Sequence, residues 1–467
     1  MCSNSWAAVR DSVLEKVVPD EDERMRLDRL RSRVEDGLSK LLAERGFRAM
    51  AEVHGSAVRD TWLAGVRDVD VFIVLDGDYG RGVLPQVLDV AKEYVGEGWV
   101  EAYAEHPYIR AVVEGFDVDF VPCFRIDPEE GLISATDRTP LHTGFVLERL
   151  SPEGSDEVRL LKRFMKGVGV YGAEVRISGF SGYLCELLVI RLGSFMRVLE
   201  EAAGWSRGEV LDVGESYSGN AGGGFSNPLI VVDPVDPRRN VASAVSETSL
   251  WTFVAAAKAF LNEPRESFFY PEKPQVEVSE LLEVLRSFGS RLLFVVVDDG
   301  DVGVPDVLWG QLYKTKKAMV ELLRGADFQI VRDGVWSDEA ARHLFVFELE
   351  SDVLGRSKKR MGPPVRIMED SARFIEVHLD AEDTVSGPWI EGDRWWVEKM
   401  RTVRDARSLI DSVLEDGGRD IGVSRKLAIW FREGGRVLTG DEIGEFLEPG
   451  MSFFLYRFLR GRPVWLE

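Results

Sequence analysis

Two alternating runs of aspartate and apolar residues constrain this chain more than any other feature. In the first run, Asp68 and Asp70 flank a valine and lead into the apolar residues 71–74. Residues i and i+2 of a β-strand face the same side, so the two carboxylates project together while the valine faces the opposite layer. The second run, residues 116–122, places Asp117 and Asp119 in a similar alternation and offers a third carboxylate. The runs predict neighbouring strands that bring three carboxylates together.

A glycine–serine pair precedes the first run. Gly55 and Ser56 follow the short apolar segment 50–53 and precede the helix-compatible segment 57–63. This order predicts free backbone N–H groups at a helix N-terminus, where they can hold phosphate. Paired carboxylates beside such a phosphate cradle are what two Mg²⁺ ions require. The stretch therefore predicts a metal-dependent site for a phosphorylated substrate.

Composition limits the class of protein. The 467 residues are enough for about three domains, and no apolar run nears the roughly 18 residues of a membrane span. Three scattered cysteines indicate neither a disulfide framework nor a zinc site, and the start lacks the pattern of a signal peptide. We expect a cytoplasmic protein with no membrane partner. The net charge of −22 opposes nucleic-acid binding, so any RNA contact requires local basic surface.

Apolar periodicity predicts the main elements. Helical spacing indicates a long amphipathic helix over residues 21–45, and alternating runs indicate strands in the following 80 residues. Helices and a mixed sheet predict an α/β domain that ends near residue 150. The glycine-rich residues 216–226 are expected to be a connection. Further helices are expected over 85–94, 156–166, 180–199, 242–260 and 310–324, and strands over 47–53, 99–105, 108–114, 117–124, 292–298 and 343–349.

Further motifs follow the acids in order. They are His106-Pro107-Tyr108-Ile109-Arg110, Arg138-Thr139-Pro140-Leu141-His142-Thr143, Glu157-Val158-Arg159-Leu160-Leu161-Lys162, Tyr171-Gly172-Ala173-Glu174, Gly179-Phe180-Ser181-Gly182-Tyr183-Leu184-Cys185-Glu186-Leu187, and Asp233-Pro234-Val235-Asp236 with Arg239-Asn240. The acids and the glycine–serine pair resemble the nucleotidyltransferase superfamily that includes DNA polymerase β and the poly(A) polymerases. The ordered set, over nearly the whole chain, resembles the archaeal, class I CCA-adding enzymes, or CCA tRNA nucleotidyltransferases.

The resemblance implies an α+β multidomain fold. Residues 1–150 are expected to form a polymerase-β-like nucleotidyltransferase catalytic domain, with a mixed sheet and helices. Residues 151–262 are expected to form a helical central domain of the poly(A) polymerase or oligoadenylate synthetase type. Residues 263–385 are expected to form a C-terminal α/β body domain, and residues 386–467 a tail domain that binds tRNA.

The resemblance also implies the reaction. Members of that family add and repair the 3′-terminal CCA sequence of tRNA, using CTP and ATP without a template and releasing diphosphate. Asp68, Asp70 and Asp119 match the catalytic and metal-binding residues of the family. The first two are expected to bind two Mg²⁺ ions, and Asp119 to bind the catalytic ion and help deprotonate the primer 3′-hydroxyl. The implied partner is tRNA, contacted at its acceptor stem and elbow.

Nine residues are expected to bind ATP or CTP. Gly55 and Ser56 offer donors to the phosphates and Arg59 adds charge, while Arg239 matches the arginine that reads the incoming base. The other positions matched to the nucleotide are His106, Thr139, His142, Lys162 and Tyr171. Taken singly, Lys162 also fits a solvated charge, Tyr171 a core edge and His142 a structural hydrogen bond. Asp233 and Asp236 are expected to be turn and capping residues outside the site.

Basic clusters in the C-terminal half are the candidates for RNA contact, because the whole chain is acidic. Aromatic residues lie beside one of them, and rings can stack on exposed bases. Each cluster also fits an ordinary solvated surface. The candidate RNA-binding residues are Lys314, Lys316, Arg356, Lys358, Lys359, Arg394, Arg401 and Arg404.

Two other functions remain open from the sequence. A poly(A) polymerase or oligoadenylate synthetase would share the acids and the glycine–serine pair, but would use ATP alone. A non-catalytic RNA-binding relative would usually have lost an acid, whereas Asp68, Asp70 and Asp119 are all present. The sequence leaves the oligomeric state open, with a homodimer as one alternative.

Overall fold

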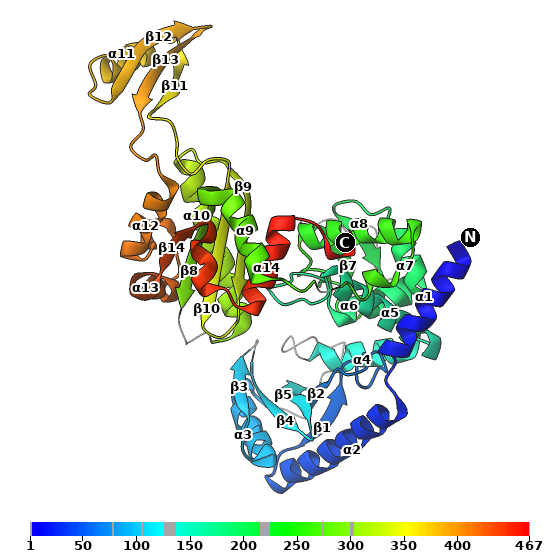
Figure 1. Cartoon of the computed structure of the whole chain (residues 1–467). Coiled ribbons are helices and arrows are strands. Elements are labelled where there is room, and N and C mark those ends of the chain that lie inside the picture. The colour runs from blue at the N-terminus through cyan, green and yellow to red at the C-terminus, as the bar shows by residue number, and fades with distance from the viewer. Residues whose placement is uncertain are drawn as a thin grey trace. The chain divides into compact units, whose positions relative to one another are not determined.

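The computed structural model describes residues 2–76, 79–103, 106–125, 137–214, 225–272, 274–298 and 303–466. Figure 1 shows the chain, which divides into two compact units. Unit 1 comprises residues 1–273 and 462–467, and unit 2 comprises residues 274–461. Across the described ranges, no helix is both long enough and apolar enough to cross a membrane. The finer division into four domains remains a prediction.

A five-stranded mixed sheet forms the N-terminal part of unit 1. Its order is β1-β2-β5-β4-β3, in which β2 and β5 are parallel and the other neighbours antiparallel. Val69 and Val71 of β2 are buried in the same core as α2 and α3, which cover one face of the sheet (Figure 1). Asp68 and Asp70 therefore lie on the other face, as the alternation predicts. The bounds are α2 Glu21–Glu44, α3 Leu84–Val95, β1 Ala49–His54, β2 Asp68–Leu75, β3 Val100–Tyr103, β4 Pro107–Val113 and β5 Phe116–Phe124.

A helical layer with an aromatic core completes unit 1. The ring of Phe164 lies within 6.2 Å, centroid to centroid, of five other phenylalanine rings. Trp465 stacks on Phe268 at 5.8 Å, so the residues after Gly461 belong to this core. The elements are α1 Cys2–Val17, α4 Arg138–Arg149, α5 Pro152–Val168, α6 Gly182–Leu192, α7 Phe195–Ala202 and α8 Glu247–Asn262, with the parallel pair β6 Glu209–Asp212 and β7 Leu229–Val232.

Unit 2 contains two antiparallel sheets with helices. The first sheet has the order β14-β8-β10-β9, and the second has the order β11-β13-β12 with α11 packed on it. The expected boundary between body and tail at residue 385 falls inside β12, and each sheet contains strands from both sides of it. The bounds are α9 Val278–Phe288, α10 Pro305–Gly325, α11 Met368–His378, α12 Ala406–Asp416, α13 Arg425–Gly434, α14 Pro449–Arg460, β8 Leu292–Asp298, β9 Ile330–Ser337, β10 Arg342–Leu349, β11 Ser357–Pro364, β12 Thr384–Glu391, β13 Arg394–Met400 and β14 Arg436–Thr439.

Three expected helices differ from the structure. Residues 57–63 form no helix; the chain turns instead, and Asp60 adopts φ 51°, which is outside the helical region. The helix expected over 180–199 is two helices, because Gly193 ends α6 at φ 95° and the Ser194 side chain caps α7. The helix expected from residue 242 begins only after Ser246, which caps α8. The expected connection at 216–226 lies almost entirely outside the described residues.

At Gly167, α5 closely approaches another backbone segment. A Cβ atom at Gly167 would come within 3.0 Å of the carbonyl oxygens of Phe268 and Phe269, closer than real Cβ atoms come. Gly167→Ala should therefore lower the free energy of unfolding by about 1–3 kcal/mol. Gly144→Ala, in open space on α4, should raise it by about 0.5–1 kcal/mol through helix propensity. Denaturant unfolding measures both, and equal effects of the two changes would contradict the close packing.

Candidate active site

The three predicted acids lie on adjacent parallel strands. Asp70 of β2 pairs in register with Asp119 of β5, and Asp68 pairs with Asp117 two residues before. Parallel, in-register neighbours project their side chains to the same face, so Asp70 and Asp119 lie side by side. This places the third acid beside the first two, on the sheet face opposite α2 and α3.

Gly55 allows the Asp70 carboxylate to approach the preceding turn. It adopts φ 76°, a conformation that favours glycine, and a Cβ atom there would fall within 3.0 Å of Oδ2 of Asp70. Ser56 and Arg59 continue the turn, closed by the backbone bond from Arg59 N to Gly55 O at 3.3 Å. The predicted phosphate cradle is therefore a series of turns next to the acid, rather than a helix N-terminus.

The Asp70 carboxylate sits in surroundings that disfavour its charge. Burial raises its pKa from 3.8 to about 6, and the charge of Asp119 is the next cause, followed by an opposing effect of Arg59. The Asp70 side chain is surrounded by protein atoms, but part of its surface remains accessible to water. A cation bound among these carboxylates would remove the repulsion, so the donor set fits a metal ion.

Arg110 of β4 neutralises the third acid. Its Nε and Nη2 donate to the two carboxylate oxygens of Asp119 at 2.7 and 2.8 Å, a bidentate pair. In the part of the chain that the structure describes, no three His, Cys, Asp or Glu side chains form a ready-made ligand group around one point. The acids are neighbours on the sheet, and Arg110 holds one of them.

Glu186 is a fully buried carboxylate that holds two predicted phosphate ligands. Its Oε2 lies 3.0 Å from Nε of Arg59, and its Oε1 lies 3.2 Å from Nζ of Lys162. The Thr61 hydroxyl also donates to Oε1. Burial acts to raise the pKa of Glu186, but the charges of Arg59 and Lys162 bring it below its ordinary value. The two cations are therefore positioned by one ionised acid.

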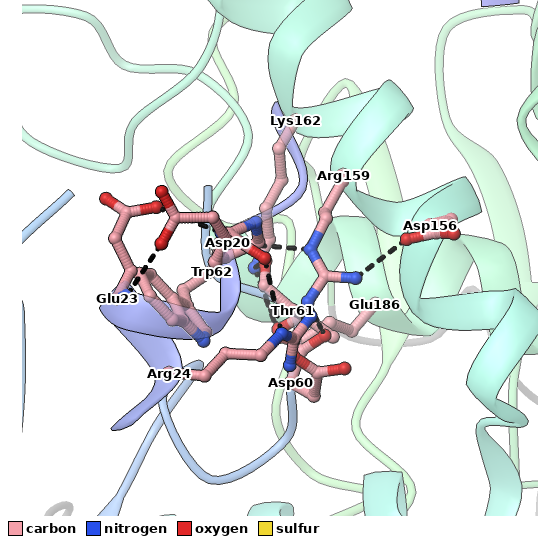
Figure 2. Close-up of polar contacts among 11 residues, drawn as sticks. Asp20, Glu23, Arg24, Asp60, Thr61, Trp62, Asp156, Arg159, Lys162 and Glu186 are labelled. Carbon is pink, nitrogen blue, oxygen red and sulfur yellow. Dashed lines mark hydrogen bonds and ion pairs between the residues drawn. The ribbon is translucent and has the colours of Figure 1, made fainter. Parts of the chain in front are cut away.

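Side chains of α5 and α2 fix the chain just before β2 (Figure 2). Nζ of Lys162 donates to the carbonyl and the hydroxyl of Thr61 at 3.0 and 3.1 Å. Arg159, one turn earlier, donates to the Asp60 carbonyl at 2.6 Å, and Arg24 of α2 contacts the Asp60 carboxylate at 2.6 Å. These bonds tie the turn that carries Arg59 to the helical layer.

Asp233 joins the two other predicted base and sugar ligands. It is fully buried, and its Oδ2 accepts from Nε2 of His142 at 3.0 Å and from Nη1 of Arg239 at 2.7 Å. The His142 ring stacks on Tyr183 at a centroid separation of 4.0 Å. Burial lowers the pKa of His142 although Asp233 acts in the opposite direction, so the imidazole is mainly neutral at pH 7. One acid thus orients both side chains.

The remaining nucleotide candidates lie at the edges of these clusters. A Cβ atom at Gly182 would meet the Tyr171 hydroxyl at 3.0 Å and Nζ of Lys162 at 3.6 Å, which places the two candidates near each other. Thr139 lies in the first turn of α4, and its carbonyl accepts from the Thr143 hydroxyl at 3.0 Å. Nε2 of His106 is buried without a hydrogen-bond partner in the described part of the chain. Their roles toward a nucleotide stay predictions.

Most of the predicted RNA-binding cations in unit 2 have protein partners. Ion pairs join Lys316 to Asp333, Lys358 and Arg401 to Asp327, and Lys359 to Glu391, while Arg394 and Arg404 donate to the carbonyls of Gly362 and Leu354. Lys314 and Arg356 have no ion pair within the described ranges. An RNA phosphate would have to compete with these acids, so RNA binding by this surface stays a prediction.

Two acids, Asp233 and Glu186, hold site residues in place through contacts that the sequence does not indicate. Asp233 forms the expected turn, in which its Oδ1 accepts from Val235 N at 3.1 Å, and it also orients His142 and Arg239. Glu186 has no assigned role, although it is the lone acid in the apolar run 184–189, a pattern typical of a buried counter-ion. That signal identifies Glu186 as buried and paired, but not its partners.

Comparison with known proteins identifies the family. The CCA-adding enzyme of Methanosarcina barkeri is 41% identical over 457 residues, covering 96% of this chain and 97% of that protein. This chain belongs to the CCA-adding enzyme family. The CCA-adding enzymes of Methanothermobacter thermautotrophicus and Halobacterium salinarum are 37% and 38% identical over 95% of the chain and 96% of each relative.

Three family models match successive parts of the chain. "Nucleotidyltransferase domain" matches residues 32–142, "tRNA nucleotidyltransferase, second domain" matches 156–270, and "CCA-adding enzyme, C-terminal domain" matches 289–431. The expected α+β multidomain fold with a nucleotidyltransferase domain is confirmed. The chain is a nucleotidyltransferase of this family, and nucleotidyltransferases use divalent metal ions.

Gly55→Ala tests the contact between the turn and Asp70. Alanine at Gly55 would be strained in the left-handed backbone conformation, and its Cβ atom would displace the Asp70 carboxylate. Because the displaced carboxylate could no longer position the reacting groups, we expect turnover to fall at least ~100-fold. Gly65→Ala is the matched control, because Gly65 has φ 77° but open space around its Cβ position. Both variants should lose similar thermal stability. Equal turnover of the two would contradict the role of this contact.

The raised pKa of Asp70 predicts a pH-dependent stability. The folded protein holds the Asp70 proton at higher pH than the unfolded chain, so this group lowers the free energy of unfolding as pH rises from about 4 to 6. Asp70→Asn should therefore be more stable than the wild type at pH 8 in a chelator, and the gain should vanish near pH 4. Denaturant unfolding at the two pH values measures this. Asp28→Asn, on the exposed surface of α2, should follow the wild type; a pH-independent gain in Asp70→Asn would contradict the raised pKa.

Proposed function

We propose that this chain adds and repairs the 3′-terminal CCA of tRNA, using CTP and ATP without a template and releasing diphosphate. The observation that carries the proposal is the in-register pair of Asp70 and Asp119 beside Gly55, in a chain of this family. The primer 3′-hydroxyl attacks the α-phosphate of the nucleotide, a bond from that phosphorus to the primer oxygen forms, and diphosphate leaves.

Asp68, Asp70 and Asp119 are the proposed ligands of two Mg²⁺ ions. When bound, the ions would stabilise the attacking and leaving oxygens. Burial and, after it, the charge of Asp119 raise the pKa of Asp70, which supports a cation at this position. Asp119 would also take part in removing the proton of the primer hydroxyl, and its release from Arg110 would accompany substrate binding.

The nucleotide is proposed to lie between the proposed metal ligands of β2 and β5 and the two buried carboxylates, Glu186 and Asp233. Backbone N–H groups at Gly55 and Ser56, with Arg59, would bind the triphosphate. His106, Thr139, His142, Lys162 and Tyr171 are the other proposed ligands. Arg239 would read the base through its donors, held by Asp233 in a fixed orientation. A fixed orientation supports selection between bases because a mobile guanidinium would satisfy several acceptor patterns.

The proposed macromolecular partner is tRNA, at its acceptor stem and elbow. The candidates for this contact lie in unit 2, chiefly Lys314 and Arg356, which have no ion pair in the described part of the chain, and the paired cations of β11 and β13. Lys359 also lies 4.2 Å from the ring centroid of Trp396, so aromatic and basic groups are adjacent there. We also propose a cytoplasmic location and a homodimer.

Primer extension tests the proposed reaction. Purified protein with Mg²⁺, CTP and ATP should extend tRNA lacking its 3′ end by three nucleotides and then stop. Asp70→Asn should reduce the rate at least ~100-fold, because a displaced metal ion disturbs both position and charge. Asp28→Asn should retain the wild-type rate. Continued addition of A with ATP alone would indicate a poly(A) polymerase, and unchanged extension by folded Asp70→Asn would reject the acid assignment.

A further inference from the structure

Two lysines lie one turn apart on α5, and they differ in what they contact. Lys162 is 2% exposed, and its ammonium group donates to the Thr61 carbonyl, the Thr61 hydroxyl and Glu186. An ammonium group has three N–H donors, and the protein uses all three. To bind a phosphate as proposed, Lys162 would have to exchange one of these contacts for it.

Lys166 has the opposite character. Its side chain is exposed, and no carboxylate lies within 4.0 Å of its Nζ in the described ranges. The Nζ lies 5.2 Å from the ring centroid of Tyr171, one of the nucleotide candidates. Burial of part of the group and the charge of Arg163 lower the pKa of Lys166, while Asp68 acts to raise it, so the ammonium group feels the first acid of β2.

The positions of these groups indicate what Lys166 faces. Tyr171 lies against Gly182 and near Lys162, and the Asp68 charge acts on both Tyr171 and Lys166. Lys166 thus lies beside Tyr171 without an ion pair in the described ranges, and the charges of Asp68 and Glu174 both act on it.

We propose that Lys166 binds a phosphate group of the incoming nucleotide, in addition to the ligands described above. This inference rests on the proposed function, because it assumes that the triphosphate lies beside β2. A phosphate of the RNA primer has the same chemistry, and the experiment separates these two sources. A phosphate would replace the weak ring contact by a charge-assisted hydrogen bond.

Lys166→Met tests the proposal by separating nucleotide from RNA binding. We expect the KM for both CTP and ATP to rise about 10-fold or more, as loss of one charge-assisted hydrogen bond predicts. Inorganic tripolyphosphate should also become a weaker competitive inhibitor, while tRNA affinity stays unchanged. Lys166→Arg should recover most of the nucleotide affinity, since it restores the charge. Lys258→Met, an exposed lysine on α8, is the matched control.

Other outcomes overturn the proposal. Unchanged KM and unchanged tripolyphosphate inhibition in folded Lys166→Met would show that Lys166 meets no nucleotide phosphate. Weaker tRNA binding with unchanged KM would assign Lys166 to the RNA backbone instead. Calorimetry measures tripolyphosphate binding even if the protein does not extend tRNA. Failure of the proposed function would instead appear in the wild-type extension assay, so the two failures can be distinguished. Lys162→Met should lower the melting temperature, unlike Lys166→Met, because it leaves Glu186 with fewer partners.

Discussion

The rest of the candidate site depends on the buried carboxylate of Glu186. It receives Arg59 from the turn after β1, Lys162 from α5 and the Thr61 hydroxyl, and so connects the sheet to the helical layer of unit 1. A buried charge that loses its partner is strongly destabilising, typically by about 3–5 kcal/mol. Loss of Glu186 would therefore remove the contacts with Arg59, Lys162 and Thr61 at once. The turn that approaches Asp70 is held by charge as well as by apolar packing.

The acids of unit 1 fall into two electrostatic classes. Glu186 and Asp233 are buried with cationic or hydrogen-bonding partners, and the pKa of each lies below its ordinary value. Asp70 has carboxylate neighbours instead, and its pKa is raised. Glu186 and Asp233 orient the cationic and hydrogen-bonding side chains around them. The effect of Arg59 on Asp70 is too small to cancel the effects of burial and of Asp119. This difference, rather than the presence of carboxylates alone, distinguishes a place for a cation from a structural ion pair.

Local pattern was sufficient for the strands that carry the acids, because alternation over residues 68–74 and 116–122 fixes which side chains share a face. Helix boundaries were less predictable: Asp60 and Gly193 interrupt helical spacing through backbone conformation, which apolar periodicity does not report. The pairing of Asp233 with His142 joins residues 91 positions apart. No spacing rule reaches that far, so the sequence indicated the turn at Asp233, which the structure has, but not its contacts with His142 and Arg239.

The packing of Trp465 on Phe268 makes unit 2 an insertion within unit 1. The chain leaves unit 1 after residue 273, forms two sheets and their helices, and returns at residue 462 to fill a place in the aromatic core. During synthesis, Phe268 is therefore made nearly 200 residues before Trp465, because the 188 residues of unit 2 separate the two segments of unit 1. The core of the nucleotidyltransferase half is complete only when the other half has already been made.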